Sequence, residues 1–203
     1  MSVRTRVKTG AAGLVAAACV AVLMAPAQAS AAPAPTGAAG GGDNCVANLG
    51  TGTAACYPSF REAIKAATGG RVADAPTARR AAGDKDFLTR LNAPANGGGA
   101  PDARIADPQY VQGVLYEHGG YRGRTLVLQS YLNCNAGKDK WLLAGYELHD
   151  FNDIVSSVVV IPGCKVTLYQ HASHQGEARS YTASTSWLGL MNDHASSFNV
   201  HSL

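Results

Sequence analysis

The sequence predicts an all-β sandwich or barrel that follows a small α+β unit. From Tyr110 onward, short apolar runs alternate with glycine, asparagine and aspartate turn signals, and no helical period separates them. Strands at such spacing are typical of a sandwich or barrel, and about 95 residues suffice for one such domain. Residues 44–91 instead contain one hairpin pattern and two helical patterns. A repeat within the β region indicates that it is built from two similar halves.

The first 29 residues have the pattern of a secretory signal peptide. Three basic residues precede an apolar run over 11–25, and the small-residue sequence AQA follows at 27–29. This run is too short to span a bilayer permanently, which disfavours a retained anchor. We therefore expect a secreted, extracellular protein in which residues 30–43, rich in Ala, Pro and Gly, form a flexible linker.

Charge and cysteine content narrow the function classes. The chain has 17 Lys and Arg against 14 Asp and Glu, and 3 of the basic residues lie in the signal, so 17 − 3 leaves 14 of each sign. No basic block remains, so we expect neither nucleic acid nor a membrane as partner. An even number of cysteines in an exported chain indicates two disulfides, whose pairing the count alone leaves open. Cys19 lies in the signal, and the four that remain are Cys45, Cys56, Cys134 and Cys164.

The unit over 44–91 is expected to begin with a hairpin. Pairing Cys45 with Cys56 is the connectivity that we prefer, because it places Gly50 and Thr51 at the turn centre. A two-residue turn that begins with glycine suits the type II′ geometry, which matches the twist of paired strands.

Two helices are expected after this hairpin. Ser59 and Glu62 have the spacing of a capping box, and a second short helix is predicted over 86–91. Because the unit over 44–91 has few large apolar side chains, it can bury only a small core. We therefore expect its stability to depend on its disulfide or on contacts with the β domain. A linker rich in Gly, Pro and Ala is expected over 92–108, before the β domain over 109–203.

Two motifs recur in the β domain in the same order. The hairpin sequence LYEHGGYRG at 115–123 aligns with LYQHASHQG at 168–176, and NDIVSS at 152–157 aligns with NDHASS at 192–197. The first copy is longer, and its extra residues include a loop insertion that carries Cys134. Two units that cannot close alone are expected to pair and share one core.

These motifs resemble the βγ-crystallins, and specifically their microbial calcium-binding members. Each Greek-key motif of that family opens with an aromatic, four residues, an aromatic, one residue and a glycine, matched here by Tyr116, Tyr121 and Gly123. Each closes with the double clamp Asn/Asp-Asn/Asp-x-x-Ser/Thr-Ser, which both copies supply in full.

The resemblance implies a βγ-crystallin-like sandwich of two Greek keys over 109–203, and it does not extend to 44–91. His174 replaces the second aromatic of the second hairpin, so that corner is expected to pack less firmly.

The resemblance also implies two calcium sites, each with ligands from both clamps. Calcium accepts carboxylate, hydroxyl, amide and carbonyl oxygens in flexible geometry. In the family, backbone carbonyls join from the third clamp position and from the residue after the hairpin tyrosine. The expected metal-binding residues are Glu117, Asn152, Asp153, Ile154, Ser156, Gln170, Asn192, Asp193, His194 and Ser196. The alternative is that each clamp is an Asx/Ser turn that satisfies backbone N–H groups.

Other groups of residues have weaker claims. His171 and His174 suggest a zinc site, but their spacing does not direct both imidazoles at one ion. Glu147, His149 and Asp150 suggest a hydrolytic set, but no nucleophile motif accompanies them, so we expect no enzyme. Two tryptophans at comparable places in the repeat are expected in the core: Trp141 and Trp187.

The function expected from these observations is that of a secreted, non-catalytic structural or binding module that two Ca²⁺ ions stabilise. A secreted inhibitor of an extracellular proteinase is the alternative, with the loop 134–140, braced by a Cys134–Cys164 disulfide, as the inhibitory segment. A toxin directed at a cell-wall component is a third hypothesis, because one fold can serve several functions and does not decide among them. The oligomeric state, and whether residues 30–91 form a cleaved pro-segment, are left open.

Overall fold

The computed structural model describes residues 42–93, 109–134 and 141–203, without the side chains of 141–146. The strands are β1 (Asn44–Asn48), β2 (Thr53–Tyr57), β3 (Tyr110–His118), β4 (Arg122–Ser130), β5 (Trp141–Glu147), β6 (Ser157–Val160), β7 (Cys164–His171), β8 (Gln175–Tyr181) and β9 (Ser197–Ser202). The α-helices are α1 (Phe60–Ala67), α2 (Ala78–Ala81) and α3 (Lys85–Leu91). The 3₁₀ turns are η1 (His149–Phe151), η2 (Ala172–His174) and η3 (Gly189–Met191).

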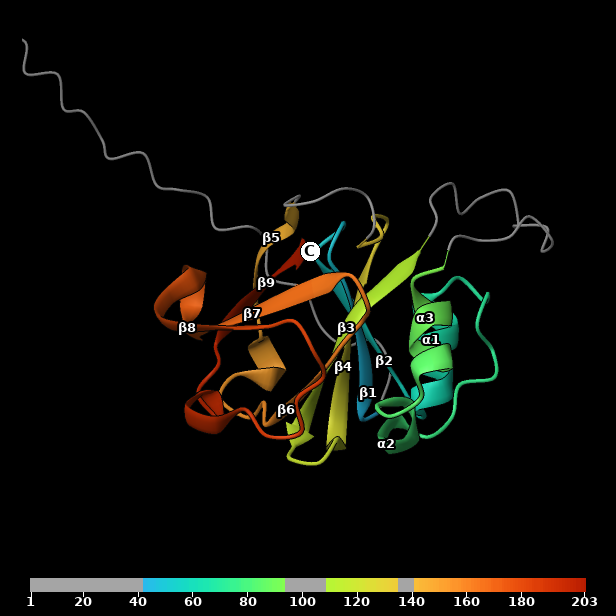
Figure 1. The fold of residues 1–203 in the computed structure, drawn as a ribbon, viewed down its shortest axis with the longest axis horizontal. Coiled ribbons are helices and arrows are strands. Elements are labelled where there is room, and N and C mark those ends of the chain that lie inside the picture. Colours follow the sequence, from blue (N-terminus) through green and yellow to red (C-terminus); the bar gives the residue numbers. More distant parts are fainter. Residues whose placement is uncertain (1–41, 94–108, 135–140) are drawn as a thin grey trace, which may run out of the picture. The chain divides into compact units, whose positions relative to one another are not determined.

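The strands form two sheets (Figure 1), with the orders β2-β1-β4-β3-β6 and β5-β9-β7-β8. Strands β3, β4 and β6 of the first repeat lie in the first sheet, and its strand β5 pairs in the second sheet. The second repeat keeps β7, β8 and β9 together and reaches back to the first sheet through the bridge between Thr185 and Val158. The expected fold class, a two-Greek-key β-sandwich preceded by a small α+β unit with a disulfide, is confirmed.

The N-terminal hairpin extends the first sheet. Strand β1 pairs antiparallel with β2 and parallel with β4, from Asn44 opposite Thr125 to Asn48 opposite Gln129. Helix α1 packs on β1 and β4, and α3 packs on β3 (Figure 1). Strands β3 and β4 are therefore buried along most of their length.

Helix α1 begins where its capping residues predict. Ser59 Oγ accepts the N–H of Glu62 at 3.2 Å and donates to its carboxylate at 3.1 Å. This satisfies an N–H that has no partner inside the helix. The second expected helix, over 86–91, is confirmed as α3, whose Asp84 cap accepts the N–H of Phe87 at 2.9 Å. Helix α2 was not expected.

The Cys45–Cys56 disulfide and its register are confirmed, but the expected two-residue type II′ turn is wrong. The ladder ends at the Asn48–Thr53 pair, so the loop spans 49–52, and Gly52 rather than Gly50 has a positive φ of 70°. The Asn48 side chain accepts the N–H groups of Gly50 and Thr51 at 3.0 and 3.1 Å. Such an Asx turn competes with a tight hairpin turn, because it captures the backbone donors first.

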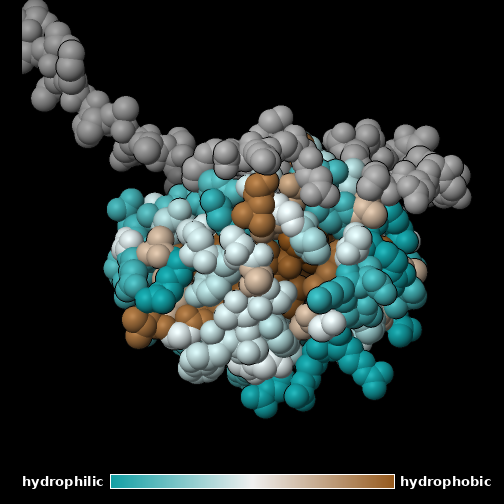
Figure 2. All heavy atoms as spheres, in the orientation of Figure 1, coloured by the Kyte–Doolittle hydropathy of each residue, from teal (hydrophilic) through white to brown (hydrophobic). Residues whose placement is uncertain are grey.

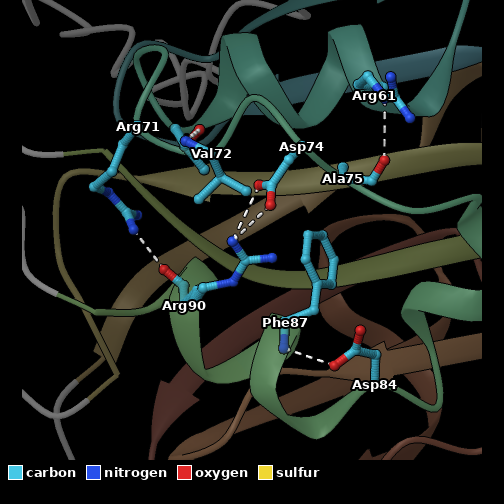
Figure 3. Close-up of polar contacts among 9 residues, drawn as sticks. Arg61, Arg71, Val72, Asp74, Ala75, Asp84, Phe87 and Arg90 are labelled. Atoms are coloured by element: carbon cyan, nitrogen blue, oxygen red, sulfur yellow. Dashed lines mark hydrogen bonds and ion pairs between the residues drawn. The ribbon is translucent and has the colours of Figure 1, made fainter.

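Arginines bond the segment before α2 to both α1 and α3 (Figure 3). Arg90 pairs with Asp74 at 3.0 Å, and Arg61 donates to the carbonyl of Ala75 at 3.2 Å. Arg71 donates to the carbonyls of Arg90 and Leu91 at the end of α3, and also to that of Gln109 at 3.3 Å. The N-terminal unit is thus bonded to the start of the β domain through polar as well as apolar contacts.

The second disulfide, Cys134–Cys164, is confirmed as well. Buried Asn92 lies beside it, where its amide donates to the carbonyl of Pro162 and its oxygen accepts the N–H of Cys134.

Within the described ranges, no helix has the length and apolar character needed to cross a membrane. Apolar surface is visible over η3 and near the C-terminus (Figure 2), where Leu190 and Leu203 are exposed.

Candidate metal centre

The two clamps have the same backbone conformation. Asp153 and Asp193 take the left-handed region, with φ of 56° and 55°, and each follows a 3₁₀ turn, η1 or η3. The N–H of Asp153 donates to the carbonyl of Ala195 at 2.9 Å, and that of Asp193 donates to Val155 at 3.0 Å. These reciprocal bonds place the clamps side by side, although forty positions separate them in the sequence.

The clamp side chains cross between the two copies. Ser156 Oγ donates to Asp193 Oδ1 at 2.7 Å, and Ser196 Oγ lies 3.5 Å from Asp153 Oδ1. Each carboxylate also accepts the amide of the asparagine before it, from Asn152 or Asn192, at 2.7 Å. The result is two clusters of oxygen atoms, each with one carboxylate and one hydroxyl from opposite clamps.

The hairpins bring backbone carbonyls to the same place. The N–H groups of Ser156 and Ser196 donate to the carbonyls of Tyr116 and Tyr169, both at 2.9 Å. Ser196 Oγ donates its one hydrogen to the carbonyl of Gln170 at 2.9 Å. One cluster therefore contains oxygens of Asp153, Ser196 and Gln170.

The second serine of each clamp braces a hairpin, a role that we did not expect. Ser157 Oγ donates to the carbonyl of His118 at 2.7 Å and accepts the N–H of Tyr121 at 3.1 Å. Ser197 Oγ makes the same two bonds, to His171 at 2.6 Å and from His174 at 3.1 Å. The sequence contained an indication of this role, because both clamps have a second serine that is not among the expected ligands.

Glu117 shows how the two clusters differ. Its side chain accepts the backbone N–H of Arg124 at 3.1 Å and lies 3.4 Å from the guanidinium of that residue. The hydrogen bond from the backbone N–H of Arg124 lowers the pKa of Glu117, and the positive charge of the Arg124 guanidinium lowers it further. The carboxylate of Glu117 is thus committed to Arg124, and its backbone carbonyl remains the predicted ligand.

The remaining predicted ligands also lie in the clamps. Ile154 is half-buried and His194 is exposed; their carbonyl oxygens stay predictions. The Oδ1 atom of Asn192 is buried and has no hydrogen-bond partner among the described residues. An unsatisfied acceptor at this position is what a cation would satisfy.

The donor set fits a hard cation. It consists of carboxylate, hydroxyl, amide and carbonyl oxygens, the ligand types that calcium prefers. Across the described residues, no group of three or more His, Cys, Asp and Glu side chains is placed to hold a metal ion by itself. A metal at the clamps would therefore depend on neutral oxygens beside one carboxylate per cluster.

The two weaker candidate sites differ in how the structure arranges their residues. His174 packs its ring against Tyr169, with centroids 4.8 Å apart, while His171 is exposed. The residues of the proposed hydrolytic set, Glu147, His149 and Asp150, border a cavity.

The expected core position of Trp187 is wrong, because its side chain is 60% exposed and its ring lies on Gly119 at the tip of the first hairpin. The side chain of Trp141 and the loop 135–140 lie outside the described residues.

Comparison with solved structures gives matches to domains that cover less than half of this chain. A domain from Clostridium beijerinckii is 24% identical over 45% of this chain and 99% of its own, with a TM-score of 0.36. A domain from Flavobacterium johnsoniae is 22% identical over 44% of this chain and 93% of its own, with a TM-score of 0.34. Both are βγ-crystallin domains. This chain is similar to them.

The N-terminal domain of protein S matches similarly, at 23% identity over 45% of this chain and 97% of that domain, with a TM-score of 0.36. No protein-family model matches the chain, and no curated protein matches it in sequence. All of these TM-scores lie below 0.5.

Proposed function

We propose that the protein is a secreted, non-catalytic module that binds calcium at the two crossed clamps and is stabilised by it. The crossing of Ser156 to Asp193 and of Ser196 to Asp153 carries this proposal. A simple Asx/Ser turn would satisfy donors within its own segment. The Ser156 hydroxyl instead donates to the opposite clamp, and the Ser196 hydroxyl lies 3.5 Å from the opposite carboxylate.

Calcium would be held by the carboxylates of Asp153 and Asp193, the hydroxyls of Ser156 and Ser196, and nearby carbonyl oxygens. When bound, the ion links the two repeats through shared ligands. One carboxylate in each cluster predicts modest affinity, in the range of roughly 10⁻⁶ to 10⁻³ M. Magnesium should compete poorly, because it requires tighter octahedral geometry.

Two features support export of the chain. The signal-like N-terminus precedes a chain that contains two disulfides, which persist mainly in oxidising compartments. The loop on which the proteinase-inhibitor alternative depends lies almost entirely outside the described residues, and none of the contacts within the described ranges favours that role.

Thermal unfolding of the mature protein, stripped of metal with EGTA and then supplied with calcium, tests the proposal. A hundredfold excess of calcium over Kd stabilises a protein by about 2.7 kcal/mol for each site. We expect a clear rise in Tm with calcium, little rise with magnesium, and no rise in the double variant Asp153→Ala/Asp193→Ala.

The control is Asp86→Ala, which removes a carboxylate in the first turn of α3, away from the clamps. That variant should keep the calcium-dependent rise. An identical melting curve of the wild-type protein with and without calcium would refute the proposal.

A further inference from the structure

A cavity of about 230 Å³ lies between the N-terminal hairpin and the segment that leads into the first clamp. Its apolar wall includes Leu126, Phe151, Phe198 and the Cys45–Cys56 disulfide. Ala47 and Ala54 of the hairpin strands complete this wall. The cavity exists only because the hairpin extends the first sheet, since β1 and β2 supply one side of it.

The polar rim of the cavity carries acidic groups. Glu147 and Asp150 both border it, on either side of His149. Glu147 Oε1 accepts the N–H of Ser173 at 2.8 Å, which holds this side chain in place. Among the described residues, none of the ion pairs includes Glu147 or Asp150.

Among the described residues, Arg124 is a cation that lies beside this rim. Its guanidinium lies over the ring of Phe151, 5.3 Å from the centroid, and donates to the backbone carbonyl of Asp150 at 3.4 Å. Its charge is paired with Glu117, at 3.4 Å. The carboxylates at the rim are therefore left without a neutralising partner in the part of the chain that is described.

His149 occupies a strained position at the same rim. Its φ is 42°, and the residue at the equivalent place before the second clamp is Gly189, with φ of 64°. A residue with a side chain costs roughly 1–2 kcal/mol in this region, which a glycine avoids. A strained residue that persists where glycine would suffice suggests a role for its side chain.

We propose that this cavity binds an alkylammonium group, with the hydrocarbon chain against the apolar wall and the ammonium at Glu147 and Asp150. A lysine side chain of a partner and a free alkyl amine share this chemistry. The site uses none of the clamp side chains, so it stands or falls independently of calcium binding.

The test is an NMR titration of the mature, EGTA-treated protein with n-hexylamine, using hexanoate as a probe of equal length and opposite charge. Backbone amide shifts should move at the residues of the cavity, with a dissociation constant on the order of 1 mM for so small a ligand. Hexanoate should bind at least tenfold more weakly. Equal binding of both probes, or shifts confined to other surfaces, would overturn the proposal.

Two variants locate the site. Asp150→Asn keeps the shape of an exposed side chain and should weaken hexylamine about threefold to fivefold, as expected for a partly solvated charge pair. Ala54→Leu should abolish binding by filling the cavity, and urea unfolding checks that this variant is folded. Binding of hexylamine to both variants at wild-type strength would refute the site.

A lysine analogue blocked at both backbone ends distinguishes the two sources. Binding as tight as that of hexylamine indicates that the site accepts a side chain of a partner protein. Binding at least tenfold weaker than that of hexylamine indicates a site for the free amine.

Discussion

The two Greek-key repeats have the same clamp geometry but very different surroundings. In the first repeat, β3 contacts α3 and β7, β4 contacts α1, and Tyr116 is fully buried. In the second repeat, β8 is exposed at most positions, and Tyr169 is only half-buried. The motif residues thus determine the local backbone, while the rest of the chain determines how much each repeat contributes to stability.

The charges beside the two hairpins differ as well. Glu117 and Arg124 of the first repeat align with Gln170 and Glu177 of the second. Glu117 pairs with Arg124, whereas Glu177 pairs with Arg179 on its own strand. A basic group therefore sits beside the first hairpin at a position where the second has an acidic one.

Truncation of the two hairpin tyrosines should give the largest difference between the repeats. Tyr116→Ala removes a buried ring whose hydroxyl donates to the carbonyl of Ala78 at 3.0 Å, and it should cost about 3–5 kcal/mol. Tyr169→Ala should cost less, about 2–3 kcal/mol, because part of its surface is already in water, although it also removes the hydroxyl that accepts the amide of buried Asn199 at 2.7 Å. Urea unfolding measures both, and equal losses would show that the N-terminal unit does not set the repeats apart.

The left-handed positions before the clamps should give an intermediate effect. Gly189→Ala should cost about 1 kcal/mol through backbone strain alone. No steric clash is expected, because no atom lies within 4 Å of the added Cβ. His149→Gly is the matched control, and relief of its strain should offset the higher entropy of the unfolded chain. A loss of more than about 1 kcal/mol in His149→Gly would mean that contacts of the imidazole outweigh the strain.

The smallest effect concerns pH. The pKa of Glu117 lies below its ordinary value of 4.5, so the stability that its ionised form contributes is present above about pH 4.5 and is lost as pH falls through the lowered pKa. Because the pair is partly exposed, the loss should be below ~1 kcal/mol. Glu117→Gln should remove this part of the acid dependence of unfolding, whereas Gln170→Ala should leave it in place.

Much of this arrangement was predictable because its signals are local. The cap at Ser59, the pairing of Cys45 with Cys56 and the two clamps each depend on spacing within a short segment. The pairing of β1 with β4 was not predicted, because it joins segments about eighty residues apart. A partial signal did exist, since the unbroken apolar run Leu126–Leu128 indicates a strand that is covered on both faces.

Two expectations failed where a side chain or a neighbour overrode the pattern. The amide of Asn48 reshaped the hairpin turn, although Gly50 suits a tighter one. The ring of Trp187 packs on the glycine-containing tip of the first hairpin and is largely exposed. Neither contact can be derived from composition or spacing, because both depend on which backbone atoms happen to lie nearby.

A calorimetric titration of the EGTA-treated mature protein with calcium tests the crossed clamps most directly, with magnesium as control. We expect saturation at about two calcium ions per chain, and at about one in Asp153→Asn or Asp193→Asn, because each cluster contains one carboxylate. The absence of binding heat together with an unchanged Tm would contradict the account and leave the clamps as turns that hold the two repeats together.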